Sequence, residues 1–235
     1  QSRSSAASDV YKRQALEACR IAVTYRTPVI MLSDGYLGNG AEPWKVPDLA
    51  EIPRIDPHFA TEPNPTAADG SPRFMPYRRD PQTLARPWAL PGTKGLEHRV
   101  GGLEKSAHTG AISYDPANHE EMVATRAAKV KGIAKTIPPT AVDDPSGDAD
   151  VLVLGWGSAY GPITAAVRRV RARGLSIAQA HVRHLNPLPE DLGDVLRRYR
   201  QIVVPEMNTG QFAMLLRSKY LIDVKTISRV RGLPI

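Results

Sequence analysis

Hydrophobic and polar positions follow their clearest pattern in the stretch 151–189. An apolar run, 151–154, leads into Gly155-Trp156-Gly157, then into a helical pattern, and then into a second apolar run at 175–182. Gly174 is predicted to end the helix, because glycine readily adopts the left-handed conformation that follows many helices. The helix is expected to bury one apolar face, made of Ile163, Ala166, Val167 and Val170. Strand, helix and strand in this order predict a parallel βαβ unit, whose site lies at the carboxyl ends of its strands.

The same kind of pattern continues to the end of the chain. A helix is predicted around 188–199, with basic residues in its last turn, and is followed by a strand from Gln201 to Val204 that Pro205 ends. A second helix is expected at 211–220, and a further strand at 224–227. The inward positions of that second helix are predicted to be Phe212, Leu215 and Leu216. These elements predict an α/β fold.

The first part of the chain has a different character. A helix is predicted from Ala15 to Tyr25, and an apolar run at 28–32 predicts a buried strand that opens into the glycine-rich loop 33–40. Eleven of the 21 prolines then fall between Pro43 and Pro91, so neither helix nor sheet is expected to extend far there. Five aromatic residues are interleaved with them, which favours a long irregular segment lying on a core or a partner rather than a disordered linker: Trp44, Phe59, Phe74, Tyr77 and Trp88.

A third helix is predicted after this segment. Asp115 is a good N-cap, and Pro116 suits the first helical position because its missing N–H would be unpaired there anyway. Pro138-Pro139 and the acidic turn 143–148 are interpreted as the linker into the α/β domain. The apolar stripe of the helix is expected to be Val123, Ala127, Val130, Ala134 and Ile137.

Composition limits the functions open to the chain. The net charge of +7 is spread over helix faces rather than gathered in a block, which gives no support for a nucleic-acid partner. Cys19 is the single cysteine, so the chain alone can build neither a disulfide framework nor a cysteine-ligated cluster. It belongs to the predicted apolar face of the first helix, with Leu16, Ala22 and Val23, and is expected to be a small buried residue. No apolar run reaches the ~20 residues of a membrane helix.

The glycine turn of the βαβ unit invites comparison with a dinucleotide-binding fingerprint. Its glycines form G-x-G-x-x-x-G at 155, 157 and 161, and Tyr160 stands where the third glycine of the fingerprint belongs. The second strand ends in His181, Arg183 and His184 instead of a ribose-binding carboxylate. A tight turn with a solvated basic rim is the simpler interpretation. A Rossmann-like nucleotide-binding module, with Arg183 on a phosphate, stays an alternative.

Two polar loops are candidate substrate or subunit-interface sites. The first contains Asp34, Tyr36 and Asn39, and its alternative role is a tight turn. The second contains Glu206, Asn208 and Gln211, and its alternative role is capping of the following helix. No metal site is predicted, because the remaining candidates lack ligand spacing and are interpreted as surface residues: His98, His108 and His119.

Six long segments, in order along 15–235, closely resemble the alpha subunit of 2-oxoglutarate:ferredoxin oxidoreductase, of the actinobacterial 2-oxoacid:acceptor type. They are ALEACRIAVTYRTPVIMLSDGYLGNGAEPW, PYRRDPQTLARPWALPGTKGLEHRVGGLEK, SYDPANHEEMVATRAAKV, VLVLGWGSAYGPITAAVRRVR, HLNPLPEDLGDVLRRYRQIVVPEMNTGQ and RSKYLIDVKTISRVRGLPI. The resemblance implies oxidative decarboxylation of a 2-oxoacid, expected to be 2-oxoglutarate, to the acyl-CoA, succinyl-CoA, with reduction of ferredoxin. Pyruvate or broad 2-oxoacid specificity is the alternative.

The resemblance also implies a domain organisation. Residues 15–40 correspond to the end of a thiamine-type pyrimidine-binding domain, 41–148 to a proline-rich irregular segment with a helix and linker, and 149–235 to an incomplete transketolase C-terminal-like parallel βαβ domain. Residues 1–14 match nothing in the family and are interpreted as a non-native or artefactual leader. The family's catalytic residues are expected upstream of this fragment, so none is assigned here, and the fragment alone is expected to be inactive.

Cofactors and partners follow from the same resemblance. The whole complex is expected to hold thiamine diphosphate with Mg and a 4Fe-4S cluster, mainly on a beta subunit, and this fragment alone is expected to bind none of them. The implied partners are that beta subunit, ferredoxin, the 2-oxoacid and coenzyme A. No nucleic acid and no membrane are expected, and the implied location is the cytoplasm.

Overall fold

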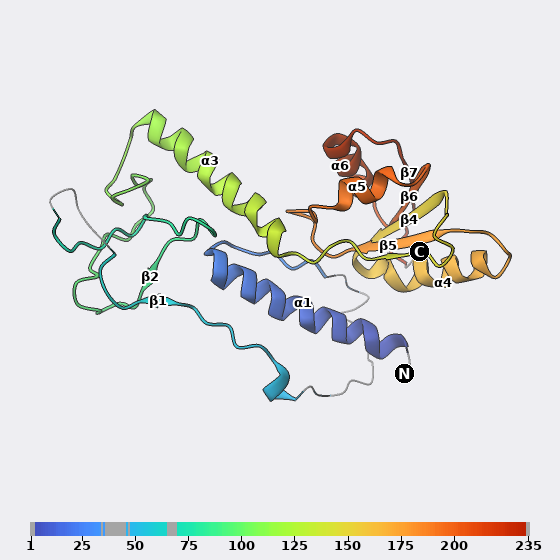
Figure 1. Ribbon diagram of the computed structural model, residues 1–235, viewed down its shortest axis with the longest axis horizontal. Coiled ribbons are helices and arrows are strands. Elements are labelled where there is room, and N and C mark those ends of the chain that lie inside the picture. Colours follow the sequence, from blue (N-terminus) through green and yellow to red (C-terminus); the bar gives the residue numbers. More distant parts are fainter. Residues whose placement is uncertain (1–2, 34, 36–45, 47, 65–69, 234–235) are drawn as a thin grey trace. The chain divides into compact units, whose positions relative to one another are not determined.

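A computed structural model describes residues 3–33, 35, 46, 48–64 and 70–233 (Figure 1). The chain divides into two compact units. The first unit is Gln1–Met31 with Glu42–Ile133, and the second unit is Leu32–Ala41 with Ala134–Ile235. None of the helices in the described part of the chain is both long and apolar enough to cross a membrane.

The second unit is built on a five-stranded sheet of order β3-β5-β4-β6-β7. Four neighbouring strands are parallel, and β3 pairs antiparallel with β5 at one edge. The predicted parallel pairing of the first two apolar runs is confirmed, with Leu152 opposite Ala178 and Trp156 opposite Val182. The strands are β3 (Val142–Asp143), β4 (Val151–Trp156), β5 (Ala178–Val182), β6 (Gln201–Glu206) and β7 (Val224–Ser228).

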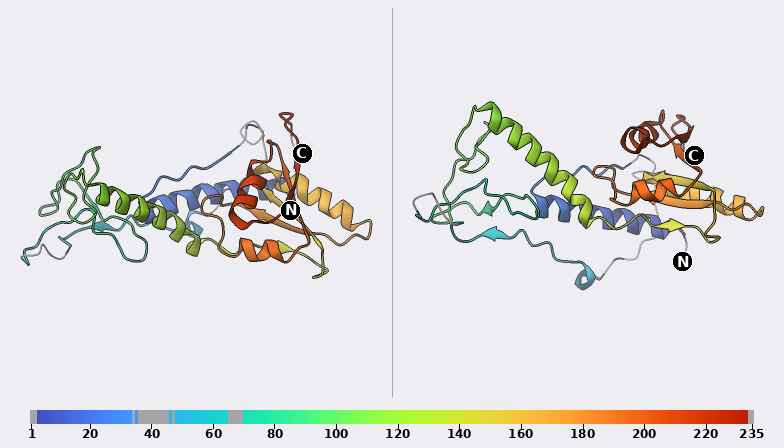
Figure 2. Two further views of the ribbon diagram at one scale, coloured as in Figure 1. Left: turned by 90° about the horizontal axis from the view of Figure 1, so that it is seen from above. Right: turned by 45° about the horizontal axis from the view of Figure 1, so that its top comes forward.

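Helices cover both faces of this sheet. Helix α4 (Tyr160–Arg171) packs on one face, while α5 (Leu192–Arg197) and α6 (Gln211–Tyr220) pack on the other (Figures 1 and 2). Successive residues of a strand point to opposite faces, so Leu152 and Leu154 join the α5–α6 core while Val153 packs against α4. Gly174 has a φ of +82°, as expected for the residue that ends α4.

Several details of the second unit differ from the sequence prediction, and α5 and β5 are both shorter than the predicted helix around 188–199 and apolar run 175–182. Strand β6 continues through Pro205 to Glu206, because β7 pairs beside it as far as the Glu206–Ser228 position. Val142 and Asp143, expected in a linker, form the edge strand β3. In α6, Ala213 is buried and Leu215 is 41% exposed, and in α4, Ala166 is exposed. The two helices therefore bury sets of residues that differ in part from those predicted.

Among its described residues, the first unit contains long irregular segments and two helices of regular length. Its elements are α1 (Arg3–Tyr25), the short 3-10 helix η1 (Leu49–Glu51), β1 (Phe59–Ala60), β2 (Trp88–Ala89) and α3 (Pro116–Gly132), which runs into η2 (Ile133–Thr136). Asp115 caps α3 as predicted, since its carboxylate accepts from the Ala117 N–H at 3.0 Å. Strands β1 and β2 pair in parallel and stack the rings of Phe59 and Trp88. The expectation of a largely irregular segment is confirmed.

The helices of the first unit bury different residues from those predicted. Helix α1 begins at Arg3, not at Ala15, and buries Ile21 and Tyr25. Leu16 and Cys19 are exposed, so the expectation of a buried cysteine is wrong. In α3, Met122 is buried while Val123 and Ala127 are exposed; Ala134 and Ile137 are buried as expected.

The apolar run 28–32 does not form the predicted strand. Its side chains are exposed, Ile30 to 84%, and no strand of the described part of the chain pairs with it. A strand is stabilised by hydrogen bonds to a neighbouring strand, and this apolar run has no such neighbour among the described residues.

Candidate functional site

The topology of the sheet marks one place for a site. From β4 the chain crosses through α4 to β5, whereas from β6 it crosses through α6 to β7, in the opposite direction along the sheet. Ligands of open α/β sheets bind outside the carboxyl ends of two adjacent strands whose connections diverge in this way. The turn after β4 and the loop after β6 therefore form the candidate site of the second unit.

On the β6 side, the predicted polar residues hold the start of α6. Glu206 is 1% exposed, and its carboxylate accepts from the N–H groups of Phe212 at 2.9 Å and Ala213 at 3.1 Å. The side-chain oxygen of Asn208 accepts from the N–H groups of Gly210 and Gln211 at 2.8 and 2.9 Å. These four bonds satisfy donors that a helix start leaves unpaired. The geometry is that of the capping alternative, and the side chain of Gln211 is exposed.

On the β4 side, Gly155 is a glycine for reasons of packing. A Cβ added there would lie 2.6 Å from Cδ1 of Ile163 and 3.1 Å from Nδ1 of His181. Gly157 differs, because its φ is +58° and an added Cβ would meet nothing within 4 Å. The first glycine therefore allows close packing of strand, helix and imidazole, and the second makes the turn.

The sequence analysis placed His181 in a solvated rim, but the structure does not. Its ring packs edge-on against Tyr160 with 5.1 Å between centroids, and its Nδ1 is buried without a hydrogen-bond partner within the described residues. Burial, helped by the charge of Arg183, lowers the pKa of His181 to about 4. The imidazole is therefore neutral at physiological pH. Arg183 itself is exposed, as expected.

The two predicted loops have different outcomes. Glu206 and Asn208 act together at the start of α6. Asp34, Tyr36 and Asn39 lie outside the described residues. The three histidines interpreted as surface residues are exposed, and among the described residues no group of three or more His, Cys, Asp or Glu side chains is arranged to hold a metal ion.

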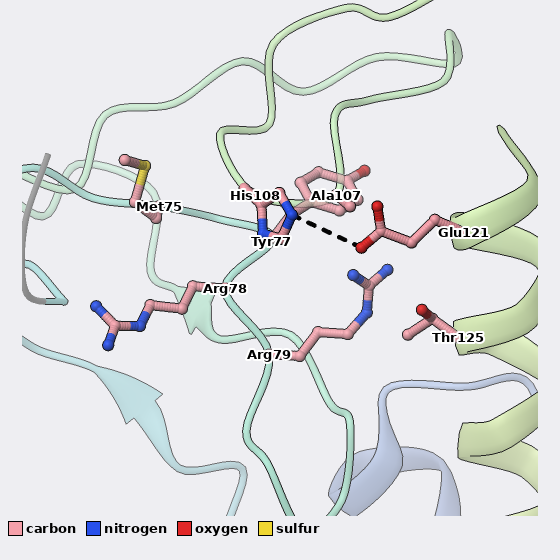
Figure 3. Close-up of a pocket in the computed structure, with 8 residues that line it drawn as sticks. All are labelled: Met75, Tyr77, Arg78, Arg79, Ala107, His108, Glu121 and Thr125. Atoms are coloured by element: carbon pink, nitrogen blue, oxygen red, sulfur yellow. Dashed lines mark ion pairs between the residues drawn. The ribbon is translucent and has the colours of Figure 1, made fainter. Parts of the chain in front are cut away.

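The first unit contains a hollow that the sequence analysis did not identify. Its volume is about 400 Å³, within the usual range of small-molecule sites (Figure 3). Two loops and the side of α3 line it, with Met75, Tyr77, Arg78, Arg79, Ala107, His108, Glu121 and Thr125. The only signal in the sequence was the Tyr-Arg-Arg run at 77–79, but a run of two arginines is also typical of an exposed loop.

Comparison with known proteins identifies relatives along most of the chain. Residues 149–233 match the family described as pyruvate:ferredoxin oxidoreductase core domain II. The 2-oxoglutarate oxidoreductase subunit KorA of Mycobacterium tuberculosis is 55% identical over 93% of this chain and 32% of its own length. The alpha subunit of 2-oxoacid:ferredoxin oxidoreductase 1 from Aeropyrum pernix is 31% identical over 86% of this chain and 31% of its own length.

A solved structure has a similar fold over nearly the same extent. It is the 2-oxoglutarate:ferredoxin oxidoreductase of Magnetococcus marinus with 2-oxoglutarate, coenzyme A and succinyl-CoA bound. The TM-score is 0.78 at 30% identity, covering 92% of this chain and 36% of that one. The predicted α/β class is confirmed, and the chain spans about a third of the length of these relatives. Together these similarities show that the chain belongs to the 2-oxoacid:ferredoxin oxidoreductase family and corresponds to part of a KorA-type subunit.

Proposed function

We propose that this chain is part of the alpha subunit of a 2-oxoglutarate:ferredoxin oxidoreductase. The complete enzyme would oxidatively decarboxylate 2-oxoglutarate, transfer the succinyl group to coenzyme A and reduce ferredoxin. The observation that carries the proposal is the 55% identity to the mycobacterial KorA subunit across 93% of this chain. The bound 2-oxoglutarate, coenzyme A and succinyl-CoA in the similar Magnetococcus marinus structure support the choice of substrate and product.

The cofactors of the reaction are proposed to be held mainly by a beta subunit. A 4Fe-4S cluster needs four thiolates, and this chain has one cysteine. The described residues also contain no group suited to hold the magnesium of thiamine diphosphate. The residues present thus do not fit these groups, and no step of the reaction is assigned to them. Cofactor, ferredoxin and the beta subunit would meet in a cytoplasmic complex, as the family resemblance implies.

Three segments of the chain are proposed to belong to different parts of that subunit. Residues 15–40 would complete a pyrimidine-binding domain, 41–148 would connect it to the next domain, and 149–235 would belong to a transketolase C-terminal-like domain. In this organisation Asp34, Tyr36 and Asn39 would face the substrate or the beta subunit. The exposed apolar run 28–32, with Ile30 84% exposed, supports a segment that completes a sheet elsewhere in the assembly.

The test is co-expression of the whole alpha subunit that contains this sequence with its cognate beta subunit. We expect the two to co-purify, and to reduce ferredoxin or a low-potential dye only when 2-oxoglutarate and coenzyme A are both present. Pyruvate in place of 2-oxoglutarate should give much slower turnover. Purification of the alpha subunit without a beta-type thiamine subunit would contradict the proposal.

A second arm uses the 235-residue chain with the same beta subunit. No turnover above that of the beta subunit alone is expected, and no tight binding of thiamine diphosphate, because the family's catalytic residues are proposed to lie outside these residues. Turnover in this arm would show that the catalytic groups are in this chain after all.

A further inference from the structure

The charged residues that line the hollow in the first unit include two neighbouring arginines, Arg78 and Arg79, and one carboxylate, Glu121. The side chain of Arg79 extends from its loop toward α3 and ends close to Glu121 and Thr125 (Figure 3). The ring of Tyr77 has two guanidinium groups near it, since the Cζ of Arg79 lies 5.8 Å and that of Arg86 4.8 Å from its centroid. Arginine next to an aromatic ring keeps its hydrogen-bond donors available at the edge of the guanidinium plane.

Helix α3 adds two further cations beside this cluster. Arg126 and Lys129 are three residues apart, so they lie on the same side of the helix. The ammonium group of Lys129 donates to the backbone oxygen of Arg26 at 3.1 Å, which holds it in place. Arg79, Arg86, Arg126 and Lys129 are here called the cationic cluster.

The carboxylates near the cationic cluster are too few to balance it. Glu104 pairs with Arg126 at 3.7 Å and with His119 at 2.7 Å, and Glu121 lies 3.7 Å from His108. Within the described residues no ion pair joins Arg79, Arg86 or Lys129 to a carboxylate.

The positive charges of the cationic cluster repel one another. Burial and then the charges of Arg86 and Arg126 lower the pKa of Arg79. Burial and then the same neighbours, with Arg79, lower the pKa of Lys129. Glu121 acts in the opposite direction on Arg79, and a bound anion would add further negative charge beside Arg79 and Lys129, which favours their charged forms.

We propose that this hollow binds a phosphate group of a small molecule, held by Arg79, which lines it. Arg86, next to the ring of Tyr77, and Lys129, one turn beyond Thr125 on α3, add positive charge nearby. Arginine matches the geometry of phosphate oxygens through two parallel N–H bonds. A phosphate carries more charge than one carboxylate, which suits three cations that have no ion-pair partner among the described residues. The hollow, of about 400 Å³, has the size of a small-ligand site. The inference goes beyond the proposed function and does not depend on it, because it concerns the first unit alone.

Titration of the 235-residue chain with inorganic pyrophosphate, followed by calorimetry at low ionic strength, tests this. We expect saturable binding of one pyrophosphate that weakens about tenfold or more in Arg79→Gln, because a charge-assisted hydrogen bond is lost. The matched control is Arg173→Gln, which removes an exposed charge in the second unit and should leave the affinity within about twofold. Equal weakening by both variants, or no binding by the wild type, would overturn the proposal.

A second variant and a second anion sharpen the titration. Arg86→Gln should also weaken binding by several-fold, which keeps the test valid if Arg79→Gln misfolds, and an unchanged affinity there would count against the site. Succinate, whose charges are carboxylates, should bind more weakly than pyrophosphate. Succinate binding that is as tight and as sensitive to Arg79 would overturn the choice of phosphate.

Discussion

Different interactions stabilise the inside of each of the two units. In the second unit, parallel strands share a core of buried residues from every second strand position and from one side of α5 and α6. In the first unit, single side chains join loops by bonding to backbone groups. Asn64 bonds both the N–H and the C=O of Met75, at 2.6 and 2.9 Å, and Asn118 bonds the Ala107 N–H and the Lys105 C=O at 2.8 and 3.0 Å. A regular fold depends on a repeating pattern, whereas such loops depend on a few individual residues.

The largest effect is expected in the core of the second unit. Leu196 of α5 is fully buried in the main cluster, so Leu196→Ala should lower the free energy of unfolding by about 3 to 4 kcal/mol through lost transfer energy and a cavity. Leu175→Ala is the control, because Leu175 is 60% exposed and should change stability by less than about 0.5 kcal/mol. Urea unfolding measures both, and similar effects would show that the core is misplaced.

The next largest effect on stability is expected when a fall in pH protonates His181. His181 has a folded pKa of about 4 against an ordinary value of 6.5, so protonation favours the unfolded chain. The contribution of neutral His181 to the free energy of unfolding is fully present above pH 6.5. It is lost as the pH falls toward 4, by roughly 3 kcal/mol. Denaturant midpoints of wild type and His181→Gln should converge over this window. Parallel curves would indicate that His181 is solvated.

Removing the charge of Glu206 should have a somewhat smaller effect. Glu206→Gln keeps the shape of the side chain but turns an amide N–H₂ group toward one of the two backbone N–H donors. Because two donors then face each other, we expect the free energy of unfolding to fall by about 2 kcal/mol. Glu190→Gln is the matched control at an exposed position in the same unit and should be nearly neutral. If Glu206→Gln leaves stability unchanged but impairs activity of the whole complex, the loop is a functional site rather than a helix cap.

The smallest effect is expected at a glycine of the first unit. Gly110 has a φ of +75°, and an added Cβ would lie 2.6 Å from Cγ of Pro76. Gly92 has a φ of +88° with nothing within 4 Å of an added Cβ. Gly110→Ala should therefore cost about 1 kcal/mol more than Gly92→Ala, the difference being the clash alone. Local amide exchange around each glycine measures this, and equal costs would mean that the loop is not packed on Pro76.

The sequence predicted the second unit well because its strands and helices follow local patterns of apolar and polar residues. The period of two in β4, the helical period in α4 and the stop at Gly174 all follow from local backbone geometry. The elements that the sequence did not predict depend on pairing between strands that are distant in the chain. Strand β3 exists because β5 offers it an open edge, and Pro205 stays in β6 because β7 pairs beside it. The apolar run 28–32 failed as a strand for the converse reason, since no described strand lies beside it.

The candidate sites divide in the same way. The sequence identified the polar loop of Glu206 and Asn208 by its composition and its place after a strand, but it could not choose between ligand binding and capping. His181 was taken for a rim residue because its burial depends on Gly155 of the neighbouring strand, 26 positions earlier. The cationic cluster brings together residues of the stretch between β1 and β2 and of α3, and no spacing rule connects Arg79, Arg86 and Lys129.

Hydrogen exchange of the whole chain tests the contrast between the units most directly. Amides of β4, β5 and β6 should be strongly protected and exchange together, because opening them requires loss of the shared core. Most amides of 70–114 should exchange far faster, because this stretch has few strand bonds, and limited proteolysis should cut there first. Fast exchange or early cleavage within 151–204, with protection of 70–114, would contradict the account.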